Sequence, residues 1–546
     1  MKKIFFLIFF AALFSCTPPV PQAPNPTFDQ AFFEQTIKTL SSDDFQGRKP
    51  FTAGDTKTVA FLEKELKALG LQPGNGDSYQ QEVPMMELDG TPGPSMEIVG
   101  AASTISLKNG EDYTIISPQN KELISVENAE IVFCGYGIVA PENNWNDYAG
   151  VDMKGKIAMV LVNDPGYATE DSTFFKGKTM TYYGRWTYKF EEAARQGAAG
   201  VLVVHETGAA GYPWFVPRRG NEIPALYLES EGDAAYKCDI EGWITYKAAG
   251  RLIKASPVKT ELLYKQAKTP GFKPVPLGLM ATTSIQNKAK TDKSANLIAV
   301  LPGTTRPDEY VLYCAHWDHL GIGTAIDGDS IYNGALDNAS GSAFVLTMAK
   351  AMTELSQKPE RSIVFLFVTA EEQGLLGSAW YASHPIFPPS KTIAALNVDG
   401  VNKYGLMKDL TITGFGQSEL EDIAAKFLVG QDRYLLPEQE PEKGSFFRSD
   451  HFNFAKIGIP ALYAKGGYDH REKGKTYAME KKNEFTSNDY HRPSDEYRPG
   501  EWDFAGVAQD MEIYFQVAWQ LANSTDFPKW KEGSEFKAIR EKKAKK

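Results

Sequence analysis

Four short and almost purely apolar runs in the second half of the chain place the strongest limit on its fold. They are Ala295–Leu301, Tyr310–Ala315, Ser362–Val368 and Thr392–Val398. A strand with one face in water alternates polar and apolar residues, whereas a strand that is covered on both faces does not. The four runs therefore predict strands of a central sheet that has helices packed on both sides.

Helical segments lie between and after these runs. The pattern predicts helices over Gly341–Leu355, Ser418–Leu428 and Phe504–Ala522, and in the last of these the apolar residues recur on one face. Strands that alternate with helices are typical of α/β proteins. We therefore expect a three-layer α/β/α domain with a mostly parallel core sheet.

Polar residues follow directly where three of the predicted strands end. His316 follows the second run, Glu371 and Glu372 follow the third, and Asp399 follows the fourth. In open α/β sheets the functional residues collect at the carboxyl ends of the strands. We therefore expect these side chains to share one cavity.

Two further segments place the same residue types beside small, turn-forming residues. Asp337 precedes Asn-Ala-Ser-Gly, and His491 follows Tyr490 and precedes Arg-Pro. Imidazole and carboxylate ligands without a thiolate suit Zn²⁺ at an open catalytic site, with Mn²⁺ or Co²⁺ as alternative metals. The five segments together predict a hydrolytic site with two metal ions.

The residue types leave some roles open at this stage. Either Asp337 or Asp399 could bridge two metal ions. Glu371 and Glu372 are adjacent, so their side chains diverge, and one could bind metal while the other acts as a base. Asp318 is placed to receive the second ring N–H of the histidine two residues before it and to fix its tautomer.

Each of these signals has a more ordinary explanation when it is taken alone. A His-x-Asp pair is common on protein surfaces, and two glutamates that open a helix favour its dipole. The hypothesis depends on five segments that coincide, most of them at the ends of buried strands. The other histidines are assigned to surface or structural positions (His205, His384, His470) or to the cavity wall (His319, His451).

The first half of the chain has a different sequence pattern. Phe28–Leu40 and Asp55–Leu69 have helical patterns and are interpreted as a covering layer without chemistry of its own. From about residue 129 onward, short β-rich runs bounded by Gly and Pro surround one helix at Phe190–Gly197. This composition indicates a separate small domain.

The first residues predict export. A charged start, Met1-Lys-Lys3, precedes an apolar run, Ile4–Phe14, which is too short to span a bilayer. The following Ser15-Cys16 resembles a bacterial lipoprotein signal, so a lipid anchor at Cys16 in the bacterial cell envelope is expected. An ordinary cleaved signal peptide is the alternative.

Charge and cysteine content exclude several classes of partner and scaffold. The formal net charge of −11 argues against nucleic acid or an anionic membrane surface as a partner. The basic C-terminal stretch is interpreted as a solvated tail. Cys134, Cys238 and Cys314 form no disulfide framework; the first two could pair, and the third is expected to be a buried apolar residue.

In order and local sequence, the five segments resemble the di-zinc aminopeptidase family, which includes aminopeptidase Y and the glutamate carboxypeptidase II and transferrin-receptor branch. The resemblance implies two zinc ions per chain. One would be held by His316 and Asp399 and the other by Glu372 and His491, with Asp337 bridging them.

The same resemblance implies the remaining roles. A water molecule between the zinc ions would attack the peptide carbonyl. Glu371 would act as the general base, Asp318 would orient a ligand, and Tyr490 would polarise the carbonyl. It also implies a cis peptide bond between Asp337 and Asn338. The interval from Gly321 to Tyr332 is longer than in compact members of the family and is expected to form a lip over the cavity.

The predicted organisation combines these observations. The small domain resembles the protease-associated domain, which is inserted in several peptidase families. The boundaries are a lipoprotein signal peptide at 1–16, a Pro-rich tether at 17–27, the N-terminal part of the peptidase domain at 28–124, the protease-associated domain at 125–275, the catalytic domain at 276–525 and a basic tail at 526–546.

The predicted function is a zinc-dependent aminopeptidase that acts on peptide substrates. A carboxypeptidase, a dipeptidase or a glutaminyl cyclase on the same scaffold is the alternative, and a binding protein that has lost the chemistry is a third possibility. The sequence does not define the residues that select the substrate or the oligomeric state. Candidate pocket segments are Ser445–Asp450, Lys465–Gly467 and Tyr212–Arg218.

Overall fold

The computed structural model describes residues 23–101, 103–220, 223–229, 237–258, 263–525 and 527–544. The predicted signal peptide and Cys16 lie outside the described residues, as does most of the Pro-rich tether. Within the described ranges, no helix combines the length and the apolar character that crossing a bilayer requires.

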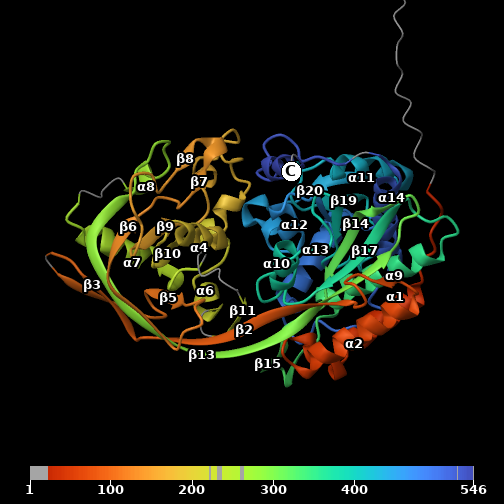
Figure 1. Cartoon of the computed structure of the whole chain (residues 1–546), viewed down its shortest axis with the longest axis horizontal. Helices are drawn as coiled ribbons and strands as arrows, with labels where there is room; N and C mark the ends of the chain where they lie inside the picture. Colours follow the sequence, from red (N-terminus) through yellow and green to blue (C-terminus); the bar gives the residue numbers. More distant parts are fainter. Residues whose placement is uncertain are drawn as a thin grey trace, which may run out of the picture.

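Two lobes make up the molecule, and the larger one is built on the predicted parallel sheet (Figure 1). Its centre has four parallel strands in the order β17 (Arg361–Val368), β14 (Arg306–His316), β18 (Thr392–Asn397) and β21 (Ala461–Lys465). Antiparallel strands flank this centre, so the prediction of a mostly parallel core sheet is confirmed. The flanking strands are β1 (Gln72–Pro73), β13 (Val275–Leu301), β19 (Asp409–Ile412) and β20 (Tyr434–Pro437).

Helices cover both faces of this sheet, as the lack of polar alternation predicts. All eight residues of β17 are buried. One face packs against α1 (Gln30–Leu40), α2 (Ala53–Ala68), α9 (Ser340–Glu354), α11 (Leu420–Leu428) and α14 (Phe504–Asn523). The other face packs against α10 (Leu376–Ser383) and α12 (His451–Lys456).

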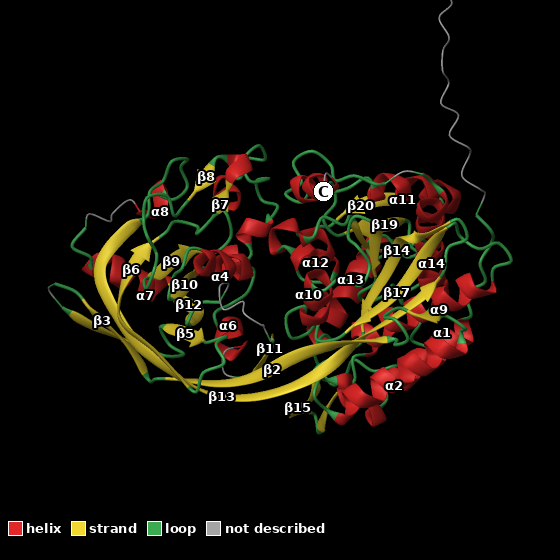
Figure 2. Cartoon of the chain, viewed as in Figure 1, coloured by secondary structure: helices red, strands yellow, loops and turns green. Residues whose placement is uncertain are grey.

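Two long strands join the lobes. β2 (Gln80–Pro92) and β13 run antiparallel, with Gln80 opposite Leu297 and Pro92 opposite Ile285. Figure 2 shows this ribbon as an arch that passes beneath both lobes. Because β13 belongs to both sheets, it ties the position of the smaller lobe directly to the sheet of the larger one.

The smaller lobe has its own sheet. Its middle is parallel, in the order β6 (Leu123–Phe133), β9 (Ile157–Leu161), β10 (Gly200–His205) and β12 (Ile240–Thr245). The other strands of this half of the chain are β3 (Ser95–Val99), β4 (Thr104–Lys108), β5 (Tyr113–Ile116), β7 (Val139–Ala140), β8 (Trp145–Asn146) and β11 (Ala225–Leu228). Its helices are α3 (Pro165–Thr169), α4 (Trp186–Arg195), α5 (Thr207–Ala210), α6 (Phe215–Gly220), α7 (Tyr246–Ala255) and α8 (Leu263–Gln266).

The apolar core of the smaller lobe begins earlier in the chain than the expected boundary at residue 125. Met96, Leu107 and Tyr113 are fully buried in it, together with residues that extend to Ile285. These residues lie on β3, β4 and β5, which pair with β13 or with strands of the smaller lobe. The two strands of the β2–β13 arch, rather than two loops, carry the chain between the lobes.

The C-terminal segment is packed against the body of the protein, which differs from the expected solvated tail. Trp530 is 3% exposed and Phe536 is 1% exposed, and both join a cluster that contains Met180 of the smaller lobe and Phe446 of the larger lobe. Arg540, in α15 (Lys537–Ala544), donates to the carbonyl oxygens of Pro389 and Thr392. Apolar anchors thus hold a segment whose sequence is dominated by charge.

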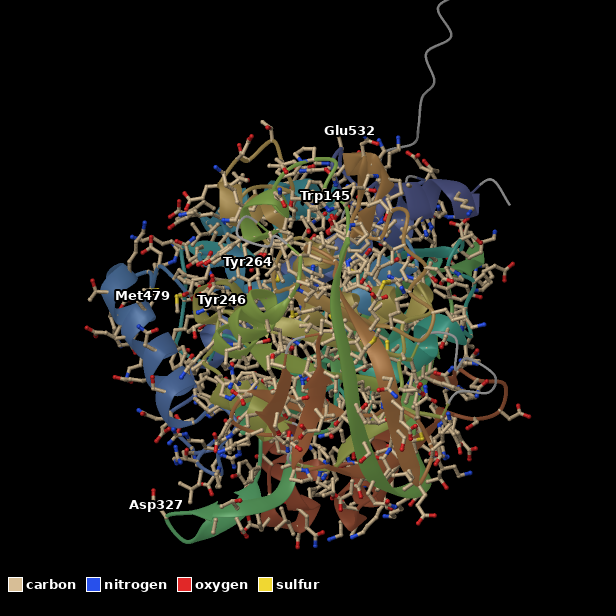
Figure 3. The ribbon with its side chains drawn as sticks, turned by 90° about the vertical axis from the view of Figure 1, so that its left-hand side faces the viewer. Trp145, Tyr246, Tyr264, Asp327, Met479 and Glu532 are labelled. Atoms are coloured by element: carbon tan, nitrogen blue, oxygen red, sulfur yellow. The ribbon has the colours of Figure 1, made fainter. Side chains whose placement is uncertain are left out.

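The interval Gly321–Tyr332 forms a hairpin of β15 (Gly321–Ile326) and β16 (Asp329–Tyr332). Figure 3 shows Asp327 at its tip, projecting away from the body. The hairpin contacts the 3₁₀ segment η1 (Asp43–Arg48), and none of its residues lines the cavity described below. It is therefore not the predicted lip.

The three described cysteines are free thiols in buried positions. Cys134 and Cys238 do not pair, and each lies in the apolar core of the smaller lobe. Cys314 is buried in β14, as expected for a small apolar residue in a central strand.

Candidate metal centre

The ends of three neighbouring parallel strands bring the first predicted ligands together. His316 is the last residue of β14 and is 1% exposed. Glu371 and Glu372 follow β17 after Ala370, whose φ of 53° turns the chain there. Asp399 follows β18. The Nε2 atom of His316 lies 3.6 Å from Asp399 Oδ1 and 3.9 Å from Glu371 Oε2.

Asp318 connects two of these segments through the backbone. Its Oδ1 accepts a hydrogen bond from the Glu371 N–H at 2.9 Å, and its Oδ2 accepts one from the Glu372 N–H at 3.3 Å. The expected contact with the His316 ring is longer, at 3.7 Å from Nδ1 to Asp318 Oδ1, and the same Nδ1 lies 3.2 Å from the Asp318 carbonyl oxygen. Asp318 therefore fixes the turn that carries both glutamates.

Asp337 lies on a turn that is held from two sides. The peptide bond between Asp337 and Asn338 is cis. Asp495 accepts hydrogen bonds from the Leu336 N–H at 2.9 Å and the Asp337 N–H at 3.0 Å. The Asn338 amide donates to the Val398 carbonyl at 3.1 Å, which links the turn to the end of β18.

The two oxygens of Asp337 face two different imidazoles. Oδ1 lies 3.4 Å from His316 Nε2, and Oδ2 lies 3.3 Å from His491 Nε2. His491 lies in the loop after α13 (Gly474–Asn488), and its Nε2 is also 3.2 Å from Glu372 Oε2. This arrangement is the one expected of a carboxylate that bridges two metal ions.

The polar atoms at the centre of this arrangement fit metal ions. His316, Glu371 and Asp399 form one group whose ligand atoms lie within 4.8 Å of one another, and a second group contains Asp337 and Glu372 with His319. Nε2 of His316 and Nε2 of His491 are buried and lack a hydrogen-bond partner among the described residues. Buried polar atoms without partners are rare unless a ligand or ion supplies the contact. Nitrogen and oxygen donors without sulfur suit Zn²⁺ at a catalytic site.

The two adjacent glutamates differ in their protonation. Burial raises the pKa of the Glu371 carboxyl well above its ordinary value, and the Asp399 and Glu372 carboxylates add to this effect against the opposing influence of His316. Burial and Asp337 also oppose ionisation of Glu372, but His491 and His319 outweigh them and lower its pKa to about 2. Glu372 thus has the character of an ionised ligand, and Glu371 has the higher proton affinity.

His319 does more than line a wall. It is fully buried, and its Nδ1 lies 2.6 Å from Glu372 Oε1, the oxygen opposite the one that faces His491. It therefore holds the carboxylate of Glu372 in place. His451 is buried among the rings of Phe446 and Tyr463, and burial lowers its pKa to about 3, so it stays neutral.

The remaining histidines lie away from the centre, as expected. His205 Nε2 lies 3.0 Å from the Tyr212 carbonyl oxygen in the smaller lobe. His384 stacks on Trp380, with 3.8 Å between the ring centroids. His470 accepts backbone hydrogen bonds from the turn that follows it.

A cavity of about 410 Å³ opens from the metal-ligand cluster. Three of the five predicted metal ligands (Asp337, Glu372, Asp399) and the predicted base Glu371 line it. Its other walls include Tyr490 and parts of two predicted pocket segments, namely Ser445, Arg448, Ser449 and Lys465–Gly467. The Tyr490 ring stacks on the His491 ring at 3.9 Å and is 46% exposed. The cavity thus joins part of the ligand cluster to a space that Tyr490 and parts of both pocket segments line.

The third predicted pocket segment, Tyr212–Arg218, does not line this cavity. Trp214 donates through Nε1 to the Gly110 carbonyl oxygen, and Tyr212 and Trp214 pack against the core of the smaller lobe. Aromatic residues in this segment therefore fill the smaller lobe instead of contacting a substrate at the centre.

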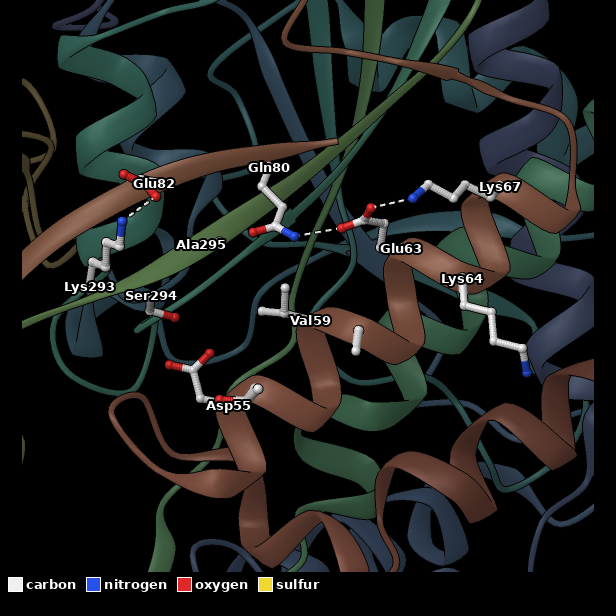
Figure 4. Close-up of a pocket in the computed structure, with 12 residues that line it drawn as sticks. Asp55, Val59, Glu63, Lys64, Lys67, Gln80, Glu82, Lys293, Ser294 and Ala295 are labelled. Carbon is white, nitrogen blue, oxygen red and sulfur yellow. Dashed lines mark hydrogen bonds and ion pairs between the residues drawn. The ribbon is translucent and has the colours of Figure 1, made fainter. Parts of the chain in front are cut away.

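A second hollow, of about 590 Å³, lies beside α2 and does not contain the predicted ligands. Figure 4 shows Asp55 pointing toward Ser294, and Glu63 joined to Gln80 and Lys67. On the α2 side of this hollow Glu63 and Lys67 form an ion pair with each other, and the size of the hollow alone does not mark a reaction site.

Two residues that hold the centre have no local signature in the sequence. Asp495 supports the Asp337 turn, and Arg48 donates to carbonyl oxygens of the loops that carry the ligands. Their contacts span many residues along the chain, so no short motif could have identified either of them.

Comparison with known proteins shows what the segment that carries this centre is similar to. Residues 296–516 match the sequence profile of Peptidase family M28. The chain is 33% identical over 138 residues to Aminopeptidase NAALADL1 of Mus musculus, which covers 24% of this chain and 17% of that protein. It is 34% identical over 294 residues to Glutamate carboxypeptidase 2 homolog of Caenorhabditis briggsae, which covers 46% and 34% of the two chains.

Among solved structures, the aminopeptidase from Aneurinibacillus sp. strain AM-1 aligns over 92% of this chain and 95% of its own, with 19% identity and a TM-score of 0.47. The matched sequence segments span well under two thirds of the curated relatives named above. The profile match includes His316, Asp337, Glu371, Glu372, Asp399 and His491. Residues 296–516 of the larger lobe are therefore similar to Peptidase family M28.

Proposed function

We propose that the protein is a zinc-dependent exopeptidase and that it acts as an aminopeptidase, removing residues from the N-termini of peptides. The observation that carries this proposal is the position of Asp337, whose two carboxylate oxygens lie 3.4 Å from His316 Nε2 and 3.3 Å from His491 Nε2. A single carboxylate between two unpartnered imidazoles is the arrangement that two metal ions require.

The ligands divide into two sets around this carboxylate. His316 and Asp399 would hold one zinc ion, and Glu372 and His491 would hold the other, with Asp337 shared between them. His319 keeps Glu372 in its ligand orientation through the 2.6 Å contact. Asp318 and Asp495 fix the two turns from which Glu372 and Asp337 project.

Two zinc ions, when bound, supply Lewis-acid activation of a water molecule and of the peptide carbonyl. The Glu371 carboxylate takes a proton from the attacking water and delivers it to the departing amine. Tyr490 lines the same cavity, and its hydroxyl would donate to the carbonyl oxygen as negative charge develops there.

An acidic residue on the cavity wall supports cleavage from the amino end. Glu438 lines the cavity, and its Oε1 accepts a hydrogen bond from the Gly414 N–H at 2.9 Å. Its Oε2 is buried without a hydrogen-bond partner in the described part of the chain. A free carboxylate oxygen of this kind suits the ammonium group of a peptide N-terminus.

A carboxypeptidase is the second candidate, and it is favoured by cations in the same cavity. Lys465 donates through Nζ to the Asp399 carbonyl oxygen at 2.8 Å, and Arg448 also lines the wall. Either cation could bind the terminal carboxylate of a peptide.

The decisive experiment tests separately whether activity depends on metal and whether the enzyme cleaves from the amino or the carboxyl end of a peptide. The purified protein is analysed for bound metal and tested on aminoacyl-nitroanilides with and without a chelator. It is then tested on pairs of short peptides that are blocked either at the amino end or at the carboxyl end.

We expect about two zinc ions per chain, loss of activity with chelator and cleavage of peptides that have a free amino end. A protein that binds no zinc and hydrolyses none of these substrates would contradict the proposal. Cleavage that requires a free carboxyl end would support the carboxypeptidase instead.

The smaller lobe and the N-terminus complete the proposal. The smaller lobe corresponds to the protease-associated domain that the sequence resembles, and Cys16 carries a lipid that anchors the protein in the bacterial cell envelope. Radiolabelled palmitate incorporation in cells, compared between the native sequence and Cys16→Ser, tests the anchor. Equal labelling of the two proteins would contradict it.

A further inference from the structure

Arg48 is a fully buried arginine that lies behind the metal centre. It ends η1, in the N-terminal part of the chain, and it is 0% exposed. A buried guanidinium is costly unless its donors are satisfied. The partners that satisfy this one are therefore informative.

Four backbone carbonyl oxygens accept hydrogen bonds from Arg48. Nε donates to Trp317 O at 2.8 Å, Nη1 to Asn333 O at 2.6 Å and to Leu40 O at 2.7 Å, and Nη2 to Gly334 O at 2.9 Å. Trp317 stands between the proposed ligand His316 and Asp318, which holds the glutamate turn. Asn333 and Gly334 lead directly into the turn that carries Asp337. One side chain thus joins the two ligand loops.

The backbone around Arg48 is shaped to allow this insertion. Gln46, Gly47 and Arg48 have φ values of 50°, 65° and 53°, all in the left-handed region. A Cβ atom on Gly47 would lie 2.4 Å from the Tyr332 carbonyl oxygen, so only glycine permits the close approach. The Asn333 side chain donates to Ser41 O at 2.7 Å and to Asp43 Oδ1 at 2.9 Å, which adds a second link between the two segments.

We propose that Arg48 is a positioning residue that preforms the metal centre, because its guanidinium holds the loop of His316 and the loop of Asp337 at a fixed separation. The proposal rests on the metal site of the proposed function and adds a residue from outside the matched family segment, which begins at residue 296. Without this link, the loops keep the hydrogen bonds that Asn338 and Ser342 donate to the His316 carbonyl oxygen, but they lose the planar fork that sets the distance from Trp317 to Asn333 and Gly334.

Charge supports the same role. The carboxylates of Asp318, Asp495, Asp337 and Glu372 all act on Arg48. Burial lowers the pKa of Arg48 to about 10, and these carboxylates oppose that effect, so the guanidinium stays charged at neutral pH. A fixed positive charge behind the carboxylates reduces their mutual repulsion when no metal is bound.

Lysine cannot replace this arginine in the same role. A guanidinium presents five N–H donors in a planar fork, whereas an ammonium presents three donors from one point. Arg48→Lys keeps the charge and the approximate size but cannot reach four carbonyl oxygens that lie around the fork. The substitution therefore removes the geometric link while it preserves most of the electrostatic contribution.

The experiment compares Arg48→Lys with a matched control, Arg361→Lys. Arg361 is 1% exposed and bonds to Glu309 and to the Leu521 carbonyl oxygen, away from the ligand loops. For each variant and for the wild type, the zinc dissociation constant is measured by competition with a chelator. Thermal unfolding of the metal-free proteins is measured in parallel.

We expect Arg48→Lys to weaken zinc binding by about 10-fold or more, as loss of groups that orient metal ligands does. Arg361→Lys should lower the unfolding temperature of the metal-free protein but leave the zinc dissociation constant unchanged. Equal zinc affinities for Arg48→Lys and wild type, or equal losses for both variants, would overturn the proposal. If the wild type itself binds no zinc, the proposed function fails, and this outcome is distinct from a failure of Arg48 as a positioning residue.

A measurement on the wild type covers the case in which Arg48→Lys does not fold. Amide hydrogen exchange is followed at residues 316–318 and 333–337 with and without zinc. Preformed loops should be protected in the metal-free protein nearly as well as in the zinc-bound protein. Rapid exchange of these amides in the metal-free protein alone would overturn the proposal.

Discussion

Each lobe contains a buried cluster of charged side chains, and the two clusters differ in how fully their polar atoms are paired. In the smaller lobe, Lys189 is 0% exposed and donates through Nζ to the carbonyl oxygens of Asn163 and Tyr183. The buried Asp164 accepts hydrogen bonds from the backbone N–H groups of Gly166 and Thr181 and from the Thr181 hydroxyl. Both charged groups are satisfied by neighbours in their own lobe.

The cluster in the larger lobe is arranged in the opposite way. Nε2 of His316 and Nε2 of His491 have no hydrogen-bond partner within the described ranges, and they lie 3.4 Å and 3.2 Å from carboxylate oxygens of Asp337 and Glu372. Burial shifts pKa values in both clusters. In the smaller lobe it lowers the pKa of Lys189 to about 7, and in the larger lobe it raises the pKa of Glu371. Burial and a shifted pKa therefore do not distinguish a reaction site from a structural one, whereas two imidazole nitrogens without partners that face the same carboxylate do.

The largest effect is expected from Glu371→Gln. The amide cannot accept the proton of water, so turnover should fall by about 100-fold to 10,000-fold. Zinc content should stay unchanged, because Glu371 is the proposed base and not a proposed ligand. Steady-state hydrolysis of an aminoacyl-nitroanilide and elemental analysis of the same sample measure both quantities. Turnover at the wild-type rate would show that another residue is the base.

Lys189→Met should lower the stability of the protein and leave its turnover unchanged, in contrast to Glu371→Gln. Loss of the Lys189 ammonium leaves the carbonyl oxygens of Asn163 and Tyr183 without their donor and removes a positive charge that acts on the buried Asp164 carboxylate, which should cost about 1–3 kcal/mol. The free energy of unfolding of the smaller lobe should fall by an amount of this order, measured by urea titration. Zinc affinity and turnover should not change below the unfolding range. A loss of zinc affinity in this variant would show that the two clusters are coupled and would break the comparison.

An intermediate effect is expected from His319→Ala. The contact between His319 Nδ1 and Glu372 Oε1, at 2.6 Å, holds a proposed ligand, so zinc should bind about 10-fold to 100-fold more weakly. The matched control is His384→Ala, because His384 stacks on Trp380 away from the centre. Competition with a chelator measures both variants. The same dissociation constant for His319→Ala and wild type would leave His319 as a wall residue.

A pH-dependent effect on stability is expected from Asp55→Asn, which tests a buried acid of the larger lobe outside the metal centre. Burial raises the pKa of Asp55 to about 6. The folded protein therefore holds this proton more tightly than the unfolded chain does. Its contribution lowers stability as the pH rises from about 4 to 6. Asp55→Asn removes that contribution, so the variant should gain about 3 kcal/mol over wild type between pH 4 and pH 7.

Urea unfolding at several pH values measures this difference, with the exposed Asp89→Asn as the control. Turnover of Asp55→Asn should match the wild type at pH 7. A stability difference that does not change with pH would show that Asp55 is ionised in the folded protein, and a loss of turnover would place it in the machinery of the reaction.

Patterns within a few residues predicted much of the larger lobe. The apolar runs at Tyr310–Ala315 and Ser362–Val368 lie in parallel strands, because a strand that is buried on both faces cannot carry polar residues at alternate positions. The ligand candidates His316, Glu371 and Asp399 lie at the ends of β14, β17 and β18 for the same reason, since only a strand end can expose a polar side chain there. The structure brings these residues together.

Contacts between distant segments could not be predicted in this way. Arg48 meets Trp317 and Asn333 across more than two hundred residues of chain, and nothing near residue 48 specifies that meeting. The border of the smaller lobe was also misplaced, because β3 and β5 join its core only through pairing with β13 and β12.

By itself, the sequence determined which residue types occupy the strand ends and therefore the kind of chemistry that the larger lobe can support. Only the tertiary structure decided which atoms face each other. It places the two oxygens of Asp337 toward separate imidazoles, assigns Asp318 to the glutamate turn and docks Trp530 against Met180 and Phe446. The physical reason is that periodicity reports local burial, whereas a site is defined by distances of a few ångströms between segments that are far apart in the chain.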